Sequence, residues 1–327
     1  MFKNVMVYRI GPAWAATAEQ IEENLDKQRF VPCGATQEQA IGWVEPRGIA
    51  QGPLIESIGG HWMVKLQIEN KVVPASVIKR KIEELVAHIE LTEGRKPGKK
   101  ERKEMRDNVL LTLLPMAFTK QGSVLVWIDP KERMLVLNAG SQGRADAVMT
   151  CLMEAAPGLT VELLQTAQSP AVAMSGWLAS QEPPAGFSVD RECELKSTDE
   201  NKSTVKYAKH SLDIDEVRGH IESGKVPTKL AMTWSGRVSF LLTDSMQVKK
   251  LNFLEGVFEN TSGEKEDKFD ADMAIATGEL SKLIPELVEA LGGELVGGLV
   301  PLTAPVAPTA GAEVATSKVT EDDSAPF

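Results

Sequence analysis

The densest group of charged residues that could bind a ligand lies between residues 92 and 106. This stretch, TEGRKPGKKERKEMR, holds seven basic and three acidic residues, although the 327-residue chain has a formal net charge of −10. Lys79, Arg80 and Lys81 come shortly before it. Clustered lysines and arginines neutralise phosphates in sequence-independent nucleic-acid binding. The patch therefore indicates a polyanion site, with the alternative that these residues only solvate an exposed surface.

Three carboxylates suggest a different chemistry, that of a metal-dependent nuclease. Asp270, Asp272 and Glu279 lie within ten residues of one another, and two-metal nucleases use clustered acids. The motif FDAD is also expected at a strand-to-helix junction, where acids commonly stabilise a helix N-terminus. We therefore predict no catalytic residue, and keep the nuclease as an alternative.

The usual soft metal ligands are scattered along the sequence, and they include no CxxC pair. They are Cys33, Cys151 and Cys193, with His61, His88, His210 and His220. Such spacing does not indicate a zinc site. We expect no metal and no cofactor, and we expect the cysteines to be reduced residues of the core.

Composition limits the class of protein. The chain is 43% hydrophobic, which is enough for one large or two to three small domains. It has no apolar run near the roughly 20 residues of a membrane span, and its first residues do not resemble a signal peptide. We expect a cytoplasmic protein that makes no membrane contact.

Strand patterns and helix patterns alternate irregularly, which predicts an α+β fold with antiparallel sheets and packed helices. Strands are expected at FKNVMVYRI, at HWMVKLQIE, in a hairpin turning at Asp129-Pro130, and in a three-strand meander between Lys229 and Phe253. Helices are expected at residues 17–29, 144–156, 213–223 and 278–291.

The basic run lies between two helical patterns. Ile78, Ile82, Leu85 and Ile89 form one apolar stripe, and Met105, Val109 and Leu113 form another. Pro97-Gly98 between them turns the chain. These features predict a protruding antiparallel helical hairpin over 75–115, within a first α+β part formed by 1–74 and 116–170. A second part covers 171–293, and 294–327 is expected to be a disordered acidic tail.

Several short motifs together resemble the RdgC family of bacterial recombination-associated proteins. They occur in order from Phe2 to about Gly293: FKNVMVYRI, PCG, GWVEP, LLPMAF, GKVPTKLAMTW, and FDADMAIATGEL with LVEALGG. The resemblance implies a ring-shaped homodimer that encircles duplex DNA without sequence specificity and limits RecA-mediated recombination. It also implies nucleoid association. Binding of single-stranded DNA stays open, and a protein-binding scaffold without DNA contact is the remaining alternative.

In such a protein the phosphate contacts come from basic residues facing one path. The candidates in the hairpin are Lys79, Arg80, Lys81, Lys96, Lys99, Lys100, Arg102 and Lys103. The candidates in the second half are Lys209, Lys225, Lys229, Lys249 and Lys250. Because neighbouring strand residues point to opposite faces, at most one of Lys249 and Lys250 is expected to face DNA.

The motif LLPMAF carries a prediction about assembly. Pro115 should end the second hairpin helix and place Phe118 on an exit turn. The family resemblance implies that Phe118 makes an apolar contact that closes the ring, and the alternative is a core phenylalanine. Met116 stands where the family pattern suggests a basic residue, so no phosphate contact is expected there.

The last residues, EDDSAPF, resemble the acidic tip of bacterial single-stranded DNA-binding proteins. By that resemblance Phe327 would fill an apolar pocket while Asp322 and Asp323 meet basic residues. Such a tip would either recruit repair proteins or fold back on the chain's own basic channel. The alternative is a tail without a role.

Overall fold

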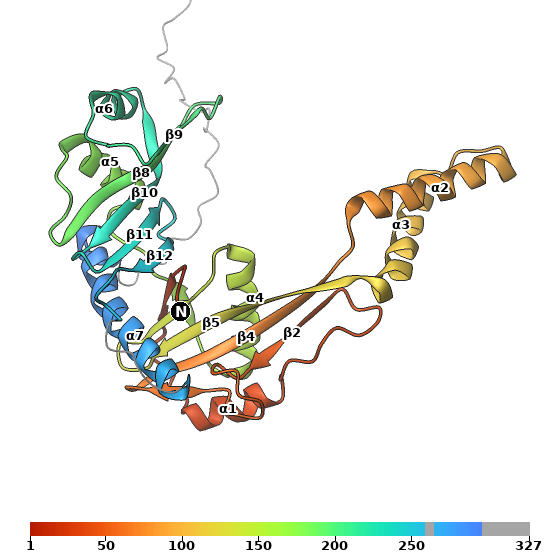
Figure 1. Ribbon diagram of the computed structural model, residues 1–327, viewed down its shortest axis with the longest axis horizontal. Helices are drawn as coiled ribbons and strands as arrows, with labels where there is room; N and C mark the ends of the chain where they lie inside the picture. The colour runs from red at the N-terminus through yellow and green to blue at the C-terminus, as the bar shows by residue number, and fades with distance from the viewer. Residues whose placement is uncertain (259–264, 296–327) are drawn as a thin grey trace, which may run out of the picture. The chain divides into compact units, whose positions relative to one another are not determined.

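The computed structural model describes residues 1–258 and 265–295, and it has the α+β architecture expected from the sequence (Figure 1). Its first antiparallel sheet has the order β2-β4-β5-β6-β1-β7, with β3 paired to β4. The strands are β1 Met6–Ile10, β2 Gln39–Val44, β3 Glu56–Ile58, β4 His61–Val72, β5 Phe118–Asp129, β6 Met134–Leu137 and β7 Val161–Leu163. The hairpin predicted at Asp129-Pro130 is β5–β6.

The second antiparallel sheet has the order β12-β11-β10-β8-β9. Its strands are β8 Phe187–Ser197, β9 Thr204–Ala208, β10 Lys225–Trp234, β11 Val238–Thr243 and β12 Val248–Phe253. The predicted three-strand meander is confirmed as β10, β11 and β12. The strands β8 and β9 were not predicted, and they extend the meander beyond β10.

Two hydrophobic clusters hold the sheets and their helices together. One packs α1 Ala18–Asp26 and α4 Gln142–Ala155 on one face of the first sheet. The other joins the opposite face of that sheet to the second sheet and to α5 Pro170–Ser180, α6 Asp215–Glu222 and α7 Lys265–Ala290. The backbones of Val5 and Val248 also exchange hydrogen bonds of 2.7 and 3.0 Å. The two α+β parts therefore share a core.

Most predicted helices are present, but their observed ends differ from the predicted ends. Three of them differ from the predicted bounds by at most three residues. Helix α7 is longer, because it begins at Lys265 and runs through Pro285. The motif FDAD therefore lies inside a helix, and its predicted place at a strand-to-helix junction is wrong. The cysteines are free: Cys193 is buried and Cys151 is half-buried against the core, but Cys33 belongs to neither hydrophobic cluster, so its core placement is wrong.

Helices α2 Ala75–Glu93 and α3 Lys99–Leu113 stand between β4 and β5 in the sequence. The paired strands reach to the base of the helices, since Val72 at the end of β4 pairs with Phe118 at the start of β5 (Figure 1). The two helices contact each other. Of their residues only Val109 is buried. Gly94 ends α2 with φ of 66°, a left-handed conformation that glycine adopts without strain.

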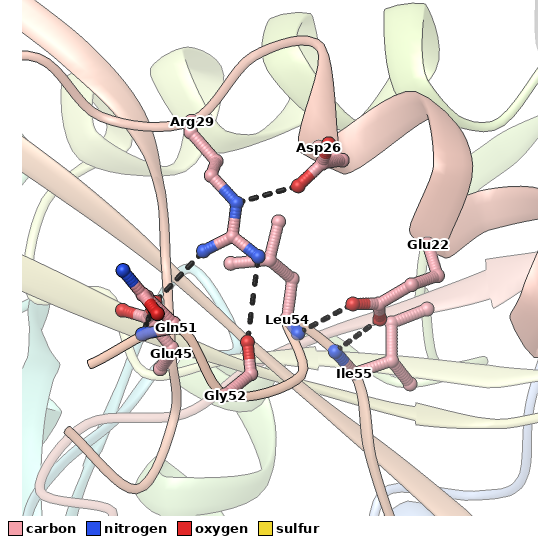
Figure 2. Close-up of polar contacts among 8 residues, drawn as sticks. All are labelled: Glu22, Asp26, Arg29, Glu45, Gln51, Gly52, Leu54 and Ile55. Atoms are coloured by element: carbon pink, nitrogen blue, oxygen red, sulfur yellow. Dashed lines mark hydrogen bonds and ion pairs between the residues drawn. The ribbon is translucent and has the colours of Figure 1, made fainter. Parts of the chain in front are cut away.

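A polar clamp fastens α1 to the loop before β3 (Figure 2). The Glu22 carboxylate accepts hydrogen bonds of 2.7 Å from the backbone amides of Leu54 and Ile55. Arg29 donates to Asp26 and to Glu45, and thereby ties the end of the helix to the same loop. The clamp satisfies buried amides that no strand partner reaches.

Removing the Glu22 carboxylate is expected to destabilise the fold. Leu54 is fully buried and Ile55 is 8% exposed, so Glu22→Ala leaves their amides unpaired, at a cost of about 2 kcal/mol in the free energy of unfolding. Urea denaturation measures this cost. The control Glu23→Ala, at an exposed position on the same helix, should stay within about 0.5 kcal/mol of the parent. Equal stability of the two variants would contradict the role given to the clamp.

Candidate nucleic-acid interface

The basic residues at the start of α2 are exposed and paired with acids one turn further along the helix. Lys79 and Arg80 lie 3.8 Å from Glu83 and Glu84 respectively, and Lys81 lies 2.8 Å from Glu84. Exposed pairs of this kind contribute about 0 to 1 kcal/mol. They leave the three basic side chains free to exchange an acid for a phosphate at little cost.

The basic residues around the start of α3 fall into two groups. Arg95 is neutralised, because it contacts Glu93 at 2.7 Å and forms a two-point ion pair with Glu101. The others have exposed side chains, and among the residues that the structure describes none of them has a carboxylate partner. They are the predicted Lys96, Lys99, Lys100, Arg102 and Lys103, with Arg106, which was not predicted. Their charge is available to a polyanion.

A second basic feature is a cavity of about 380 Å³ on the second sheet, here called the lysine cavity. Four lysines line it together with two glutamates from β8. The lysines are Lys206, Lys229, Lys249 and Lys250, the glutamates are Glu192 and Glu194, and Asn4, Cys193, Tyr207, Ala208 and Leu241 complete the lining. Three of the predicted second-half lysines thus come together in space.

Ion pairs hold the lysine cavity in place. The Glu194 carboxylate lies 3.0 Å from the Lys229 ammonium and 3.1 Å from the Lys206 ammonium, and it accepts a hydrogen bond of 3.0 Å from the Thr228 hydroxyl. Burial alone would raise the pKa of Glu194, but hydrogen bonds from Lys229, Lys206 and Thr228 outweigh it and lower that pKa to about 2. Lys250 contacts Glu192 at 2.6 Å. Glu194 is therefore ionised throughout the physiological range.

Both Lys249 and Lys250 line the cavity, although neighbouring strand residues ordinarily point to opposite faces; which of them faces DNA stays a prediction. The pairing of β11 with β12 shifts register between Ser239 and Leu241, and Lys250 has φ of 51°. This bulge interrupts the alternation of side chains, and Lys250 turns to the face that carries Lys249.

The remaining second-half candidates do not line the cavity. Lys225 is half-buried and its ammonium lies 3.1 Å from the His220 ring on α6, so it belongs to the helix-covered side of the sheet. Lys209 is exposed just after β9. Both stay predictions as DNA contacts. Lys206 lines the cavity but was not predicted from the sequence. Lys206 and Tyr207 are neighbours on β9 and point to opposite faces, and the period-two pattern of a strand there could have indicated this.

Phe118 is 87% exposed, which excludes the core alternative. It does not stand on an exit turn: α3 ends at Leu113, a 3₁₀ turn covers Leu114–Met116, and Phe118 is already the first residue of β5. Other exposed apolar side chains occur on the same pair of helices and the adjoining strand ends. They are Val72, Leu85, Leu91, Leu111 and Met116. Ring closure through Phe118 stays a prediction.

Two of the three carboxylates considered for a nuclease, Asp270 and Glu279, are separated in the structure. Asp270 and Glu279 are nine positions apart on α7, a rise of about 13 Å, whereas two catalytic metals lie about 4 Å apart. Each has an arginine partner: Arg47 contacts Asp270 at 2.6 Å, and Arg237 makes a two-point ion pair with Glu279. In the described ranges, no three or more His, Cys, Asp and Glu side chains are grouped so as to hold a metal.

A comparison with known protein families decides where this architecture belongs. The family model that carries the description "Putative exonuclease, RdgC" matches residues 1–294. The chain belongs to the RdgC family. Glu294, the last matched residue, forms an ion pair of 2.7 Å with Arg9 of β1.

RdgC relatives of similar length are known from several bacteria, each named Recombination-associated protein RdgC. The one from Dechloromonas aromatica (strain RCB) is 40% identical over 301 residues, and the one from Janthinobacterium sp. (strain Marseille) is 42% identical over 297. The one from Bordetella pertussis (strain Tohama I) is 40% identical over 296 residues. Each comparison covers 90% of this chain and 98% of the relative.

Two further expectations for this RdgC chain concern its tail and its relation to membranes. The tail residues Asp322, Asp323 and Phe327 are outside the described residues, so the predicted role of the tip stays a prediction. In the described part of the chain, no helix is both long enough and apolar enough to cross a membrane.

Proposed function

We propose that this chain is a DNA-binding protein of recombination that grips duplex DNA through its phosphates and does not read its sequence. The unpaired basic residues around the start of α3 carry this proposal. Lys96, Lys99, Lys100, Arg102 and Lys103 are exposed and have no acid partner among the described residues, and such side chains act as sequence-independent phosphate contacts. The lysine cavity supplies a second set of contacts.

The exposed apolar side chains of the α2–α3 region support a second part of the proposal, assembly as a ring-shaped homodimer. Phe118, Leu91 and Met116 are each more than 70% exposed. Met116 and Phe118 lie two positions apart at the base of α3, and neighbouring exposed apolar side chains of this kind are typical of surfaces that bind a partner. We propose that the partner is a second copy of the chain and that the helical hairpin closes the ring around duplex DNA.

A closed ring gives a physical route to limiting RecA-mediated recombination. A ring dissociates slowly, because it must open or slide off an end before it leaves. DNA inside it is not accessible to a recombinase that needs the same strands. The proposed place of action is therefore the nucleoid, and single-stranded DNA is a secondary ligand to be tested. The names of the relatives, which associate those proteins with recombination, agree with this proposal.

Retention on closed circular DNA tests the proposal. The protein is loaded at low salt on relaxed circles and on the same DNA made linear, and is then challenged with competitor DNA. A ring should stay on circles and leave linear molecules through their ends, with a dimer mass in solution. Equal loss from both forms would contradict encirclement, and no binding to either would contradict DNA binding. Incubation with Mg²⁺ or Mn²⁺ in parallel tests the alternative named in the family description, because an exonuclease would shorten only the linear DNA.

A further inference from the structure

The lysine cavity contains a feature that a simple phosphate-binding surface does not need. Three of its four lysines are already paired with acids from β8: Lys206 and Lys229 with Glu194, and Lys250 with Glu192. Glu192 and Glu194 are two positions apart on one strand, so they lie on the same face. Both line the cavity in which the ammonium groups meet.

Glu194 is held in place and does not rotate freely on the surface. Its side chain is 18% exposed, both its oxygens are engaged, and the Thr228 hydroxyl fixes one of them at 3.0 Å. Lys206 and Lys229 share the other oxygen. The carboxylate therefore stays beside the two ammonium groups at the position that an incoming phosphate would otherwise take.

A phosphate entering this cavity gains less than it would on bare lysines. Each lysine must release or share its carboxylate partner, and the negative carboxylate stays close enough to repel the phosphate. Fewer counterions are then released per contact, because the acids already neutralise part of the lysine charge. The hairpin lysines around the start of α3 have no such acid partner among the described residues.

We propose that Glu192 and Glu194 limit the affinity of the lysine cavity for DNA phosphates, so that this surface makes weak, rapidly exchanging contacts. The inference rests on the DNA binding proposed above and concerns its regulation. Weak contacts in the cavity let bound protein slide along the duplex, while the unpaired basic residues of the α2–α3 pair supply the stronger hold. The alternative is that the acids orient the lysines for binding, and it predicts the opposite effect of removing them.

Glu194→Gln separates these possibilities, because it keeps the size of the side chain and one acceptor oxygen and removes the negative charge. The matched control is Glu222→Gln, at an exposed position of α6, which changes the net charge equally. DNA affinity is measured by fluorescence anisotropy at several salt concentrations. Glu194→Gln is expected to bind about tenfold more tightly than the control, with a salt slope steeper by one to two units. It should also leave linear DNA more slowly.

Affinity equal to that of the control, or lower, would overturn the inference. A thermal unfolding curve shows whether Glu194→Gln is folded. If it is not, Glu192→Gln gives the same test at the more exposed ion pair, with an expected gain of a few fold. Measurements on the parent protein distinguish failure of the proposed function from failure of this inference. If the parent protein does not bind DNA, the proposed function fails. If it binds DNA but neither glutamine variant binds more tightly than the control, only this inference fails.

Discussion

Replacing Lys99, Lys100, Arg102 and Lys103 by alanine is expected to lower the salt dependence of DNA binding by three to four units in the slope of log K against log salt. Each lost phosphate contact removes about 0.9 from that slope. Between 50 and 200 mM salt the parent protein should therefore lose roughly 150-fold more affinity than the variant. The four side chains are exposed, so their removal should leave the fold intact.

The control for this experiment removes the same number of positive charges elsewhere. Suitable exposed lysines just after α1, on the β5–β6 turn and on α7 are Lys27, Lys131, Lys268 and Lys282. Their replacement changes the net charge equally but touches no proposed contact, so the slope should stay close to that of the parent. If both variants show the parental slope, the basic run only solvates the helices. If both show the same reduction, binding depends on net charge and not on a local surface.

Phe118→Ala is expected to weaken the contact between two copies without weakening the fold. The ring of Phe118 is 87% exposed in the single chain, so its removal leaves no cavity and the unfolding temperature should not fall. A buried aromatic anchor at an interface is typically worth about 2 to 4 kcal/mol, so dimerisation should weaken roughly 30- to 1000-fold. Analytical ultracentrifugation measures the dimer, and retention on circular DNA should fall in parallel.

Met153→Ala is the control for Phe118→Ala, because Met153 is also an exposed apolar residue, 53% exposed, but lies on α4 away from the α2–α3 pair. It should change neither the dimer nor the retention. A Phe118→Ala protein with parental dimerisation and parental retention would show that ring closure does not depend on this residue. A large drop in its unfolding temperature would instead contradict its exposed placement.

The helical pair and the meander were predictable because their signals are local. Apolar residues at helical spacing and the break at Pro97-Gly98 specify α2 and α3 from a short window. Alternating residues and tight turns did the same for β10 to β12. By contrast β8 was missed, because charged residues of low strand propensity, such as Glu192 and Glu194, alternate with its buried residues Cys193 and Leu195.

The lysine cavity could be anticipated only in part. Lys229, Lys249 and Lys250 were chosen as basic residues, but their meeting depends on the pairing of β8, β9, β10, β11 and β12, which single positions in the sequence do not encode. The bulge at Lys250 reversed the expected direction of its side chain. The opposing carboxylates were not foreseen, because acids on one strand and lysines on three others become neighbours only in the folded sheet.

The uninterrupted pairing of β4 with β5 has a mechanical consequence. The register runs from Trp62 opposite Ile128, within the sheet, to Val72 opposite Phe118 at the base of the two helices. Because β4 is hydrogen-bonded to β5 along this whole length and to β2 from Lys65 to Asn70, this part of the sheet is stiff against bending in its own plane, so it acts as a lever and not as a hinge. Force applied to α2 and α3, whether by a second copy or by DNA under tension, is therefore delivered to the core. In a ring of two copies, the weakest link is then the seam between the copies.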